Sequence, residues 1–195
     1  MPTRSLTASE LHEAQLVFGD GLDYAKVRVT EGEYFPPNFI ADIGAFFQGK
    51  KRTWDNAITL GNTVYFPRLI KTDTETIEVK KELTDIGWLV HELTHVWQFQ
   101  QFGWRYLIKT ISVQMQLGMA AYNYSGKHGS KKAALKAAYS EKRRLMDFNF
   151  EQQGDIARDY YWALKANDEP ETWRPFINEL SKQGRKVESA GRADG

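Results

Sequence analysis

The residues with the clearest chemical potential lie in the segment Leu89–Trp97, which contains the pattern H-E-x-x-H. His91 and His95 are four residues apart, so both imidazoles stand on one helix face and can reach one metal ion at about 2.0–2.1 Å. Glu92 lies about 100° around the helix axis from His91, within reach of a water bound to that metal. The pattern predicts one zinc ion bound by the two histidines, with Glu92 as the catalytic base of a hydrolase.

A third protein ligand must come from elsewhere, because a catalytic zinc takes three protein ligands and keeps one position for water. The extended motif that ends in a third histidine is absent, since Gln98 and Gln101 stand where glycine and histidine are needed. His12 and His128 are the remaining histidines, and both lie in polar stretches where we expect exposure to solvent. A downstream carboxylate is therefore the expected third ligand.

Candidates for this carboxylate occur in a second predicted helix. Glu151, Asp155 and Asp159 recur every four residues, so their side chains share one helix face. Stacked like charges repel one another, and a cation between the helices would relieve the repulsion. The competing interpretation is an acidic surface stripe paired with Arg158 and Lys165.

Together, H-E-x-x-H and the distant E-x-x-x-D resemble the gluzincin arrangement. This resemblance implies that Glu151 is the third zinc ligand and that Asp155 hydrogen-bonds the first histidine. Five segments further resemble small bacterial zincin-like proteins described as Vgr-related or Rhs-element-related, which are similar to the metallopeptidase-like domain of contractile injection systems. These segments are 17–24, 57–62, 90–98, 121–124 and 149–155.

The resemblance extends over most of residues 6–161. It implies a zincin-like fold, a metallopeptidase activity and a link to secretion-apparatus proteins such as those of type VI secretion. The basic stretch Lys127–Arg144 is longer than the family pattern, and the C-terminal tail has no counterpart in it. We expect the basic stretch to form a solvated helix face and loop.

Hydrophobic spacing predicts the elements that position these residues. Thr7-Ala8-Ser9-Glu10 is a capping box, which begins a short helix that ends at Gly19. The small sheet of the first third is expected to be mostly antiparallel. The other predicted elements are a strand at 27–29, a hairpin at 57–66 and helices at 84–103, 104–122 and 147–164.

Strands followed by helices indicate an α+β fold. The 195 residues, 42% of them hydrophobic, are enough for a single domain over residues 1–180, followed by a flexible tail over 181–195. The chain has no cysteine, so any metal must be bound by histidine and carboxylate groups. A net charge of +1 gives no reason to expect nucleic acid as a partner.

Neither a signal peptide nor an apolar run of about 20 residues is present. The sequence therefore predicts no membrane span, synthesis in the cytoplasm, and export, if any, by a route that needs no signal peptide.

Three functions are compatible with these patterns. The first is a zinc peptidase or amidase in which metal-activated water attacks a peptide or amide, Tyr122 or Tyr124 donates to the oxyanion, and an edge strand of the hairpin binds extended substrate. The second is a zinc-stabilised interaction or cargo module without activity, for which Glu92 would serve no purpose. The third, a non-haem iron oxygenase with two histidines and one carboxylate, also leaves Glu92 unexplained.

Overall fold

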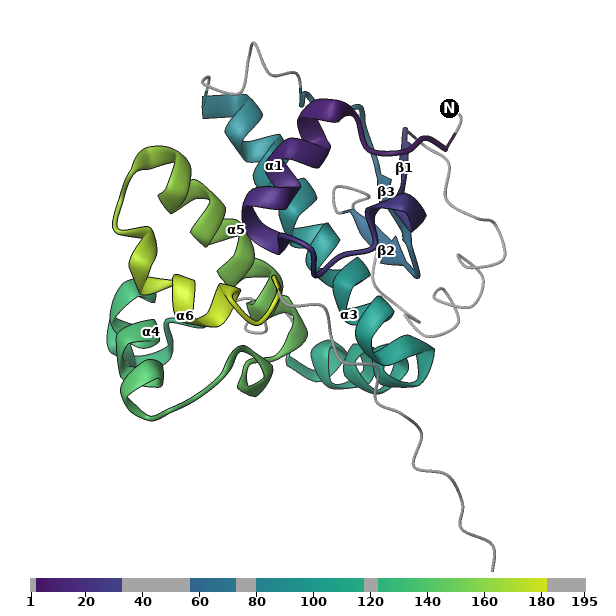
Figure 1. The fold of residues 1–195 in the computed structure, drawn as a ribbon. Coiled ribbons are helices and arrows are strands. Elements are labelled where there is room, and N and C mark those ends of the chain that lie inside the picture. The colour runs from purple at the N-terminus through teal and green to yellow at the C-terminus, as the bar shows by residue number, and fades with distance from the viewer. Residues whose placement is uncertain (1–2, 33–56, 73–79, 118–122, 182–195) are drawn as a thin grey trace, which may run out of the picture.

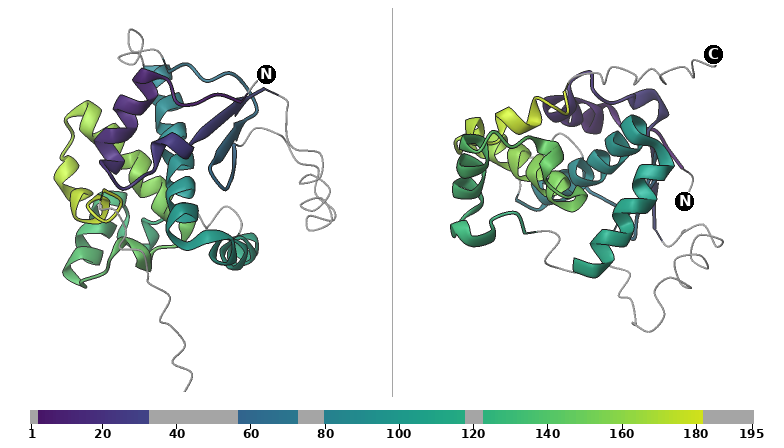
Figure 2. Two further views of the ribbon diagram at one scale, coloured as in Figure 1. Left: turned by 45° about the vertical axis from the view of Figure 1, so that its right-hand side comes forward. Right: turned by 90° about the horizontal axis from the view of Figure 1, so that it is seen from below.

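The computed structural model describes residues 3–32, 57–72, 80–117 and 123–181, with side chains of the helix at 80–117 described for residues 84–104. The helix α3 lies between a small sheet and the helix α5, and α1 packs across both helices (Figures 1 and 2). The main elements are α1 (Ala8–Phe18), β1 (Arg28–Glu31), β2 (Ile58–Leu60), β3 (Thr63–Phe66), α3 (Lys80–Leu117), α4 (Lys131–Ser140), α5 (Phe150–Ala166) and α6 (Arg174–Ile177).

The capping box predicted for α1 is confirmed. The side chain of Thr7 accepts a hydrogen bond from the backbone N–H of Glu10, and the Glu10 carboxylate accepts one from the N–H of Thr7. The helix ends at Gly19, which has φ of 48°. Both ends of the helix therefore follow from local sequence.

The predicted hairpin is confirmed, but the sheet is mixed rather than mostly antiparallel. The strand order is β1-β3-β2. Leu60 pairs with Thr63 across a two-residue turn, which makes β2 and β3 antiparallel. β1 instead runs parallel to β3, with Val29 opposite Val64. A long connection separates β1 from the hairpin, so no tight turn dictated the direction of β1.

The helix predicted at 84–103 begins earlier, at Lys80, and the break predicted at Gly103 is confirmed. Gly103 has φ of 68° and ψ of −174°, which is not helical, and the chain changes direction there (Figure 2). Helix resumes at Trp104 and is described to Leu117. The remainder of the helix predicted to Tyr122 lies outside the described residues, as does the packing of its apolar stripe.

The core forms where α3 meets the sheet on one side and α5 on the other. Val29, Val64 and Phe66 of the sheet are fully buried, as are Ile86 and Leu93 of α3. Gly87 allows a close approach to α5, because a Cβ at this position would lie 2.4 Å from Nε1 of Trp162. The side of α3 that carries the histidines is thus held at a fixed distance from α5.

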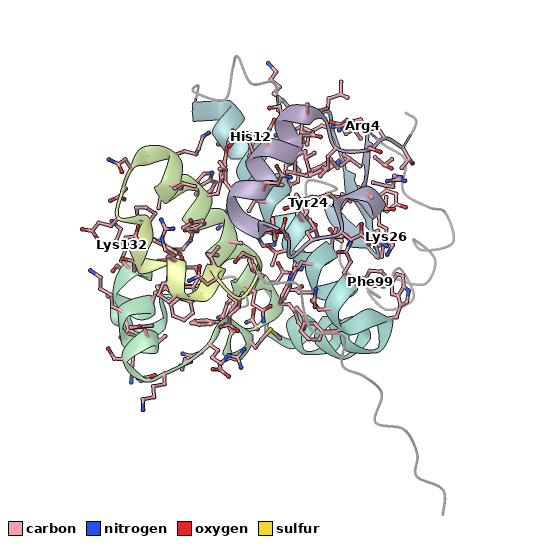
Figure 3. The ribbon with its side chains drawn as sticks, in the orientation of Figure 1. Arg4, His12, Tyr24, Lys26, Phe99 and Lys132 are labelled. Carbon is pink, nitrogen blue, oxygen red and sulfur yellow. The ribbon has the colours of Figure 1, made fainter. Side chains whose placement is uncertain are left out.

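The basic stretch at 127–144 forms α4 and its flanking turns, and most of its charged side chains are exposed, as predicted. Two of its lysines pair with acidic residues elsewhere: Lys131 with Asp159, at 2.6 Å, and Lys132 with Asp168, also at 2.6 Å. Lys132 is at the outer edge of the molecule in Figure 3.

The α+β class is confirmed. None of the described helices is long and apolar enough to cross a membrane. The tail predicted at 181–195 lies outside the described residues from residue 182 on.

A buried ion cluster attaches the N-terminal segment to the fold. Arg4 contacts Glu10 at 2.6 Å and Glu31 at 2.9 Å, and both carboxylates are buried. Glu10 also accepts from Thr72, and Glu31 accepts from the backbone N–H of Ile70. The guanidinium of Arg4 (Figure 3) therefore joins α1 to β1, and the two carboxylates join both elements to the segment that follows β3.

Replacing Arg4 with methionine is expected to lower the free energy of unfolding by about 3 kcal/mol, because two buried carboxylates lose their counter-ion. Urea denaturation measures the change. Arg144→Met is the control: Arg144 is 72% exposed and pairs with Glu179 at the surface, so its loss should cost less than about 1 kcal/mol. Equal effects of the two substitutions would contradict a structural role for the cluster.

Candidate metal centre

Three side chains predicted to bind a metal converge between α3 and α5. His91 and His95 project from the same face of α3, with their Nε2 atoms 3.2 Å apart. Glu151, in the first turn of α5, lies 3.0 Å from His91 Nε2 and 3.6 Å from His95 Nε2. The three donor atoms all lie within 4.8 Å of one another.

These donor atoms fit a zinc ion. For tetrahedral coordination at 2.0–2.1 Å, ligand atoms stand about 3.3 Å apart, close to the separations found here. Two imidazole nitrogens and one carboxylate oxygen are also a donor set that catalytic zinc uses. The geometry brings together the residues that the sequence predicted, while their binding of a metal stays a prediction.

Each histidine is oriented by a partner on its other ring nitrogen. Asp155, one turn after Glu151 on α5, has its Oδ1 atom 3.0 Å from His91 Nδ1. Gln98 places its Oε1 atom 2.8 Å from His95 Nδ1. Because both partners are acceptors, each Nδ1 carries the proton and each Nε2 faces the centre.

These partners are themselves held in place. Arg158 contacts the same Oδ1 atom of Asp155 at 2.7 Å. The amide nitrogen of Gln98 donates to Oε1 of Gln153 at 2.9 Å, and Gln153 donates to the backbone carbonyl of Phe148. The orientation of the imidazoles is therefore fixed by residues of α5 and of the turn before it.

Gly154 lets α5 lie directly against the His91 ring. A Cβ at residue 154 would lie 2.8 Å from both Cε1 and Nδ1 of His91, closer than a carbon atom can approach. Position 154, just before Asp155, thus requires glycine, the residue without a Cβ.

Opposite charges dominate the electrostatics of the metal-free site. Burial would lower the pKa of His91, but hydrogen bonds with Asp155 and Glu151 and the charge of Glu92 outweigh burial and raise it to about 10. Burial would raise the pKa of Glu151, yet the two histidines hold it well below its usual range. Without metal, a protonated His91 therefore neutralises the carboxylates.

Glu92 is buried beside this cluster without being part of it. Its charge acts on both histidines, raising the pKa of each. Its carboxylate accepts a hydrogen bond of 2.7 Å from the hydroxyl of Thr59, on β2. An acidic group is therefore held next to the three donor atoms but aimed at the sheet side of α3.

Tyr124 and Asp159, which were also singled out from the sequence, are not among the three donor residues. The buried hydroxyl of Tyr124 donates to Asp159 at 2.6 Å and accepts from Trp173, so an oxyanion role would require these bonds to change. Asp159 is thereby engaged with Tyr124 and does not join the cluster. Tyr122 lies outside the described residues, and its role stays a prediction.

His12 and His128 are exposed, as expected. His12, on α1, is labelled in Figure 3.

Three residues of the site were not predicted from the sequence: Thr59, Gln98 and Gly154. Arg158 was considered only as a partner of the acidic stripe, and it does contact Asp155 and Asp159. Two of the three left a signal. Gln98 follows His95 by three residues, the spacing of neighbours on one helix face, and a glycine inside a predicted helix indicates a packing requirement. Thr59 is 33 residues from Glu92, and no local pattern could join them.

The search against protein-family models found no match. The chain is 29% identical over 167 residues to the type VI secretion system spike protein VgrG2b of Pseudomonas aeruginosa, an alignment that covers 85% of this chain and 13% of VgrG2b. A solved structure of the VgrG2b effector domain superposes with a TM-score of 0.54 and 29% identity, covering 92% of this chain and 84% of that domain.

The chain is homologous to the effector domain of VgrG2b. The predicted relation to Vgr proteins is thereby confirmed. The chain spans only about an eighth of the whole spike protein, because its counterpart there is the effector domain. Zinc binding, peptidase activity and the zincin-like fold stay predictions.

Metal-free protein should lose stability as the pH rises. The pKa of His91 is about 10 in the folded chain and about 6.5 when unfolded, so its contribution is complete below pH 6.5 and is lost as the pH approaches 10. Urea denaturation in EDTA should therefore show a steeper decline in wild type than in His91→Gln between these limits. Parallel declines would contradict the ion pairs of His91.

Gly154→Ala tests the packing of α5 on His91. Alanine ordinarily stabilises a helix by about 1 kcal/mol relative to glycine. Here the added methyl group must displace the imidazole, so we expect a lower melting temperature in spite of that gain. A higher melting temperature, measured by differential scanning calorimetry, would show that the ring moves aside freely.

Proposed function

We propose that the protein is a zinc-dependent hydrolase that cleaves a peptide or amide bond, with a zincin-like active site. The observation that carries the proposal is the convergence of two Nε2 atoms and one carboxylate oxygen, with a second carboxylate, that of Glu92, held beside them. A site that only stabilised the fold would need the three ligands but not the neighbouring acid.

In this proposal His91, His95 and Glu151 hold the zinc ion, and Asp155 and Gln98 keep the imidazoles in the correct tautomer. The metal would supply a Lewis acid that activates water and polarises the scissile carbonyl. Glu92 accepts the proton that the attacking water loses and then delivers it to the nitrogen of the leaving amine. The carboxylate thus returns to its starting state after each turnover.

Among the described residues no strand pairs with the outer edge of β2, and this edge is the proposed binding site for extended substrate backbone. Asn62, in the turn before β3, and Phe66, at the end of β3, direct their carbonyls toward β1 and the residue after it, where they accept hydrogen bonds from the N–H groups of Arg28 and Gly32. Val64 lies two residues from each of them, so its backbone groups also point toward β1. Thr59 is opposite Val64, and the two therefore form a pair that is not joined by backbone hydrogen bonds. The N–H and C=O of Thr59 therefore point away from β3, where an added strand can bind them.

Homology to the VgrG2b effector domain supports delivery by a type VI secretion system. The role of an effector is compatible with hydrolysis of a target protein or of the peptide part of a cell wall. A zinc-stabilised cargo module is the competing function, and the role of Glu92 decides between the two.

Wild type is expected to bind one equivalent of zinc, and His91→Ala or His95→Ala should abolish binding. Glu151→Ala should lower the affinity for zinc more than Asp155→Asn does, because loss of a group that only orients a ligand costs about 10–100-fold in affinity. Asp159→Asn is the control and should bind like wild type. Competition with a chromophoric chelator gives the affinities, and the reverse order would identify Asp155 as the ligand.

Glu92→Gln should keep the full zinc content and melting temperature, because the side chain does not face the metal as a ligand. An amide cannot take up the proton of the attacking water, so hydrolysis should fall by about 10²–10⁴-fold. The rates are measured on an unstructured protein such as casein and on peptidoglycan peptides. A variant with full zinc and full biological activity would instead support the cargo module.

A further inference from the structure

Thr59 is the polar end of an otherwise apolar row across the sheet. The pairing places Val29, Val64 and Thr59 side by side on β1, β3 and β2. Side chains at paired positions point to the same face, and here that face is the one covered by α3. Val29 and Val64 are fully buried. A third valine would continue the row, so the hydroxyl at 59 needs an explanation.

The hydroxyl has two acceptors within reach, both on Glu92. Thr59 Oγ1 lies 2.7 Å from Oε2 of the carboxylate and 3.2 Å from the backbone carbonyl of Glu92. A hydroxyl has a single proton to donate, and the shorter, charge-assisted bond to the carboxylate is the stronger one. In the described part of the chain, Thr59 is the donor that reaches this carboxylate.

We infer that Thr59 is a positioning residue for Glu92, which fixes the direction of the catalytic carboxylate from the substrate-binding strand. The inference rests on the proposed hydrolase function. Glutamate has three rotatable side-chain bonds, so a base without this hydrogen bond would spend part of its time turned away from the reacting water.

The backbone and the side chain of Thr59 have separate tasks. Its N–H and C=O face the outer edge of β2, which no other described strand covers and where substrate backbone would pair, while its hydroxyl holds the base on α3. A bound strand and the carboxylate are thus aligned through one residue. Removing the hydroxyl alone should leave substrate binding intact and slow the chemical step.

Thr59→Val tests this separation, because valine keeps the shape, the β-branch and the backbone groups of threonine. In zinc-loaded protein we expect kcat on casein to fall about tenfold, a hydrogen bond to a charged group being worth at least that factor. KM should stay within about twofold of wild type. Thr59→Ser, which retains the hydroxyl, should recover most of kcat.

Thr63→Val is the matched control, because this substitution makes the same chemical change at a position on the opposite face of the sheet. It should leave kcat, KM and zinc content at wild-type values. Wild-type kcat in Thr59→Val would overturn the inference. Equal losses in Thr59→Ser and Thr59→Val would also overturn it, because they would assign the effect to packing of the methyl group.

The hydrolytic activity of wild type distinguishes failure of the proposed function from failure of the inference about Thr59. If wild type and Glu92→Gln hydrolyse nothing, the hydrolase proposal fails and a catalytic role of Thr59 fails with it. The contact is then judged by a double-mutant cycle of Thr59→Val and Glu92→Ala in urea denaturation. Non-additive effects would retain Thr59 as the residue that positions the Glu92 carboxylate, and additive effects would overturn that too.

Discussion

The buried contact of His91 with Asp155 and Glu151 joins the two helices on which the site depends. Three carboxylates, those of Glu92, Glu151 and Asp155, lie around this imidazole, and among the described residues Arg158 is the guanidinium that contacts Asp155. Buried carboxylates need compensating positive charge. In metal-free protein the proton of His91 supplies it, and the same requirement makes the site suited to a divalent cation.

This electrostatic requirement also explains the close packing around the site. An ion pair inside a protein is favourable only when its geometry is fixed. Gly154 brings α5 against the imidazole, and Gly87 brings α3 close to Trp162 one turn before the histidines. The two glycines fix the distance between the helices, while Gln98 and Gln153 prevent rotation of the second imidazole. Catalytic precision in this protein would thus come from the contact between the helices.

Local patterns were sufficient to predict α1, α3 and α5 and to single out the candidate ligands, while the choice of Glu151 among the acids of α5 came from the gluzincin resemblance. The four-residue spacings of His91 with His95 and of Glu151 with Asp155 are properties of a single helix, so they could be read without knowledge of the fold. The capping box of α1 and the break at Gly103 are local in the same sense. The direction of β1 and the partner of Glu92 were not accessible, because both depend on segments that meet only in the folded chain.

The basic stretch at 127–144 packs against the middle of α5 and the residues just after its C-terminus. Lys131 and Tyr124 both contact Asp159, two turns beyond Glu151, so the third acid of the stripe serves the attachment of α4 rather than the centre. The acidic face of α5 is therefore divided between two purposes. Its first two acids contact His91, and its third supports the surrounding fold.

Anomalous X-ray scattering at the zinc edge, from crystals of zinc-loaded protein, tests the central claim most directly. The account predicts one anomalous peak about 2.0–2.1 Å from Nε2 of His91, Nε2 of His95 and a carboxylate oxygen of Glu151, with the Glu92 carboxylate outside bonding distance. Absence of a peak between these residues, or a peak coordinated by Glu92, would contradict it.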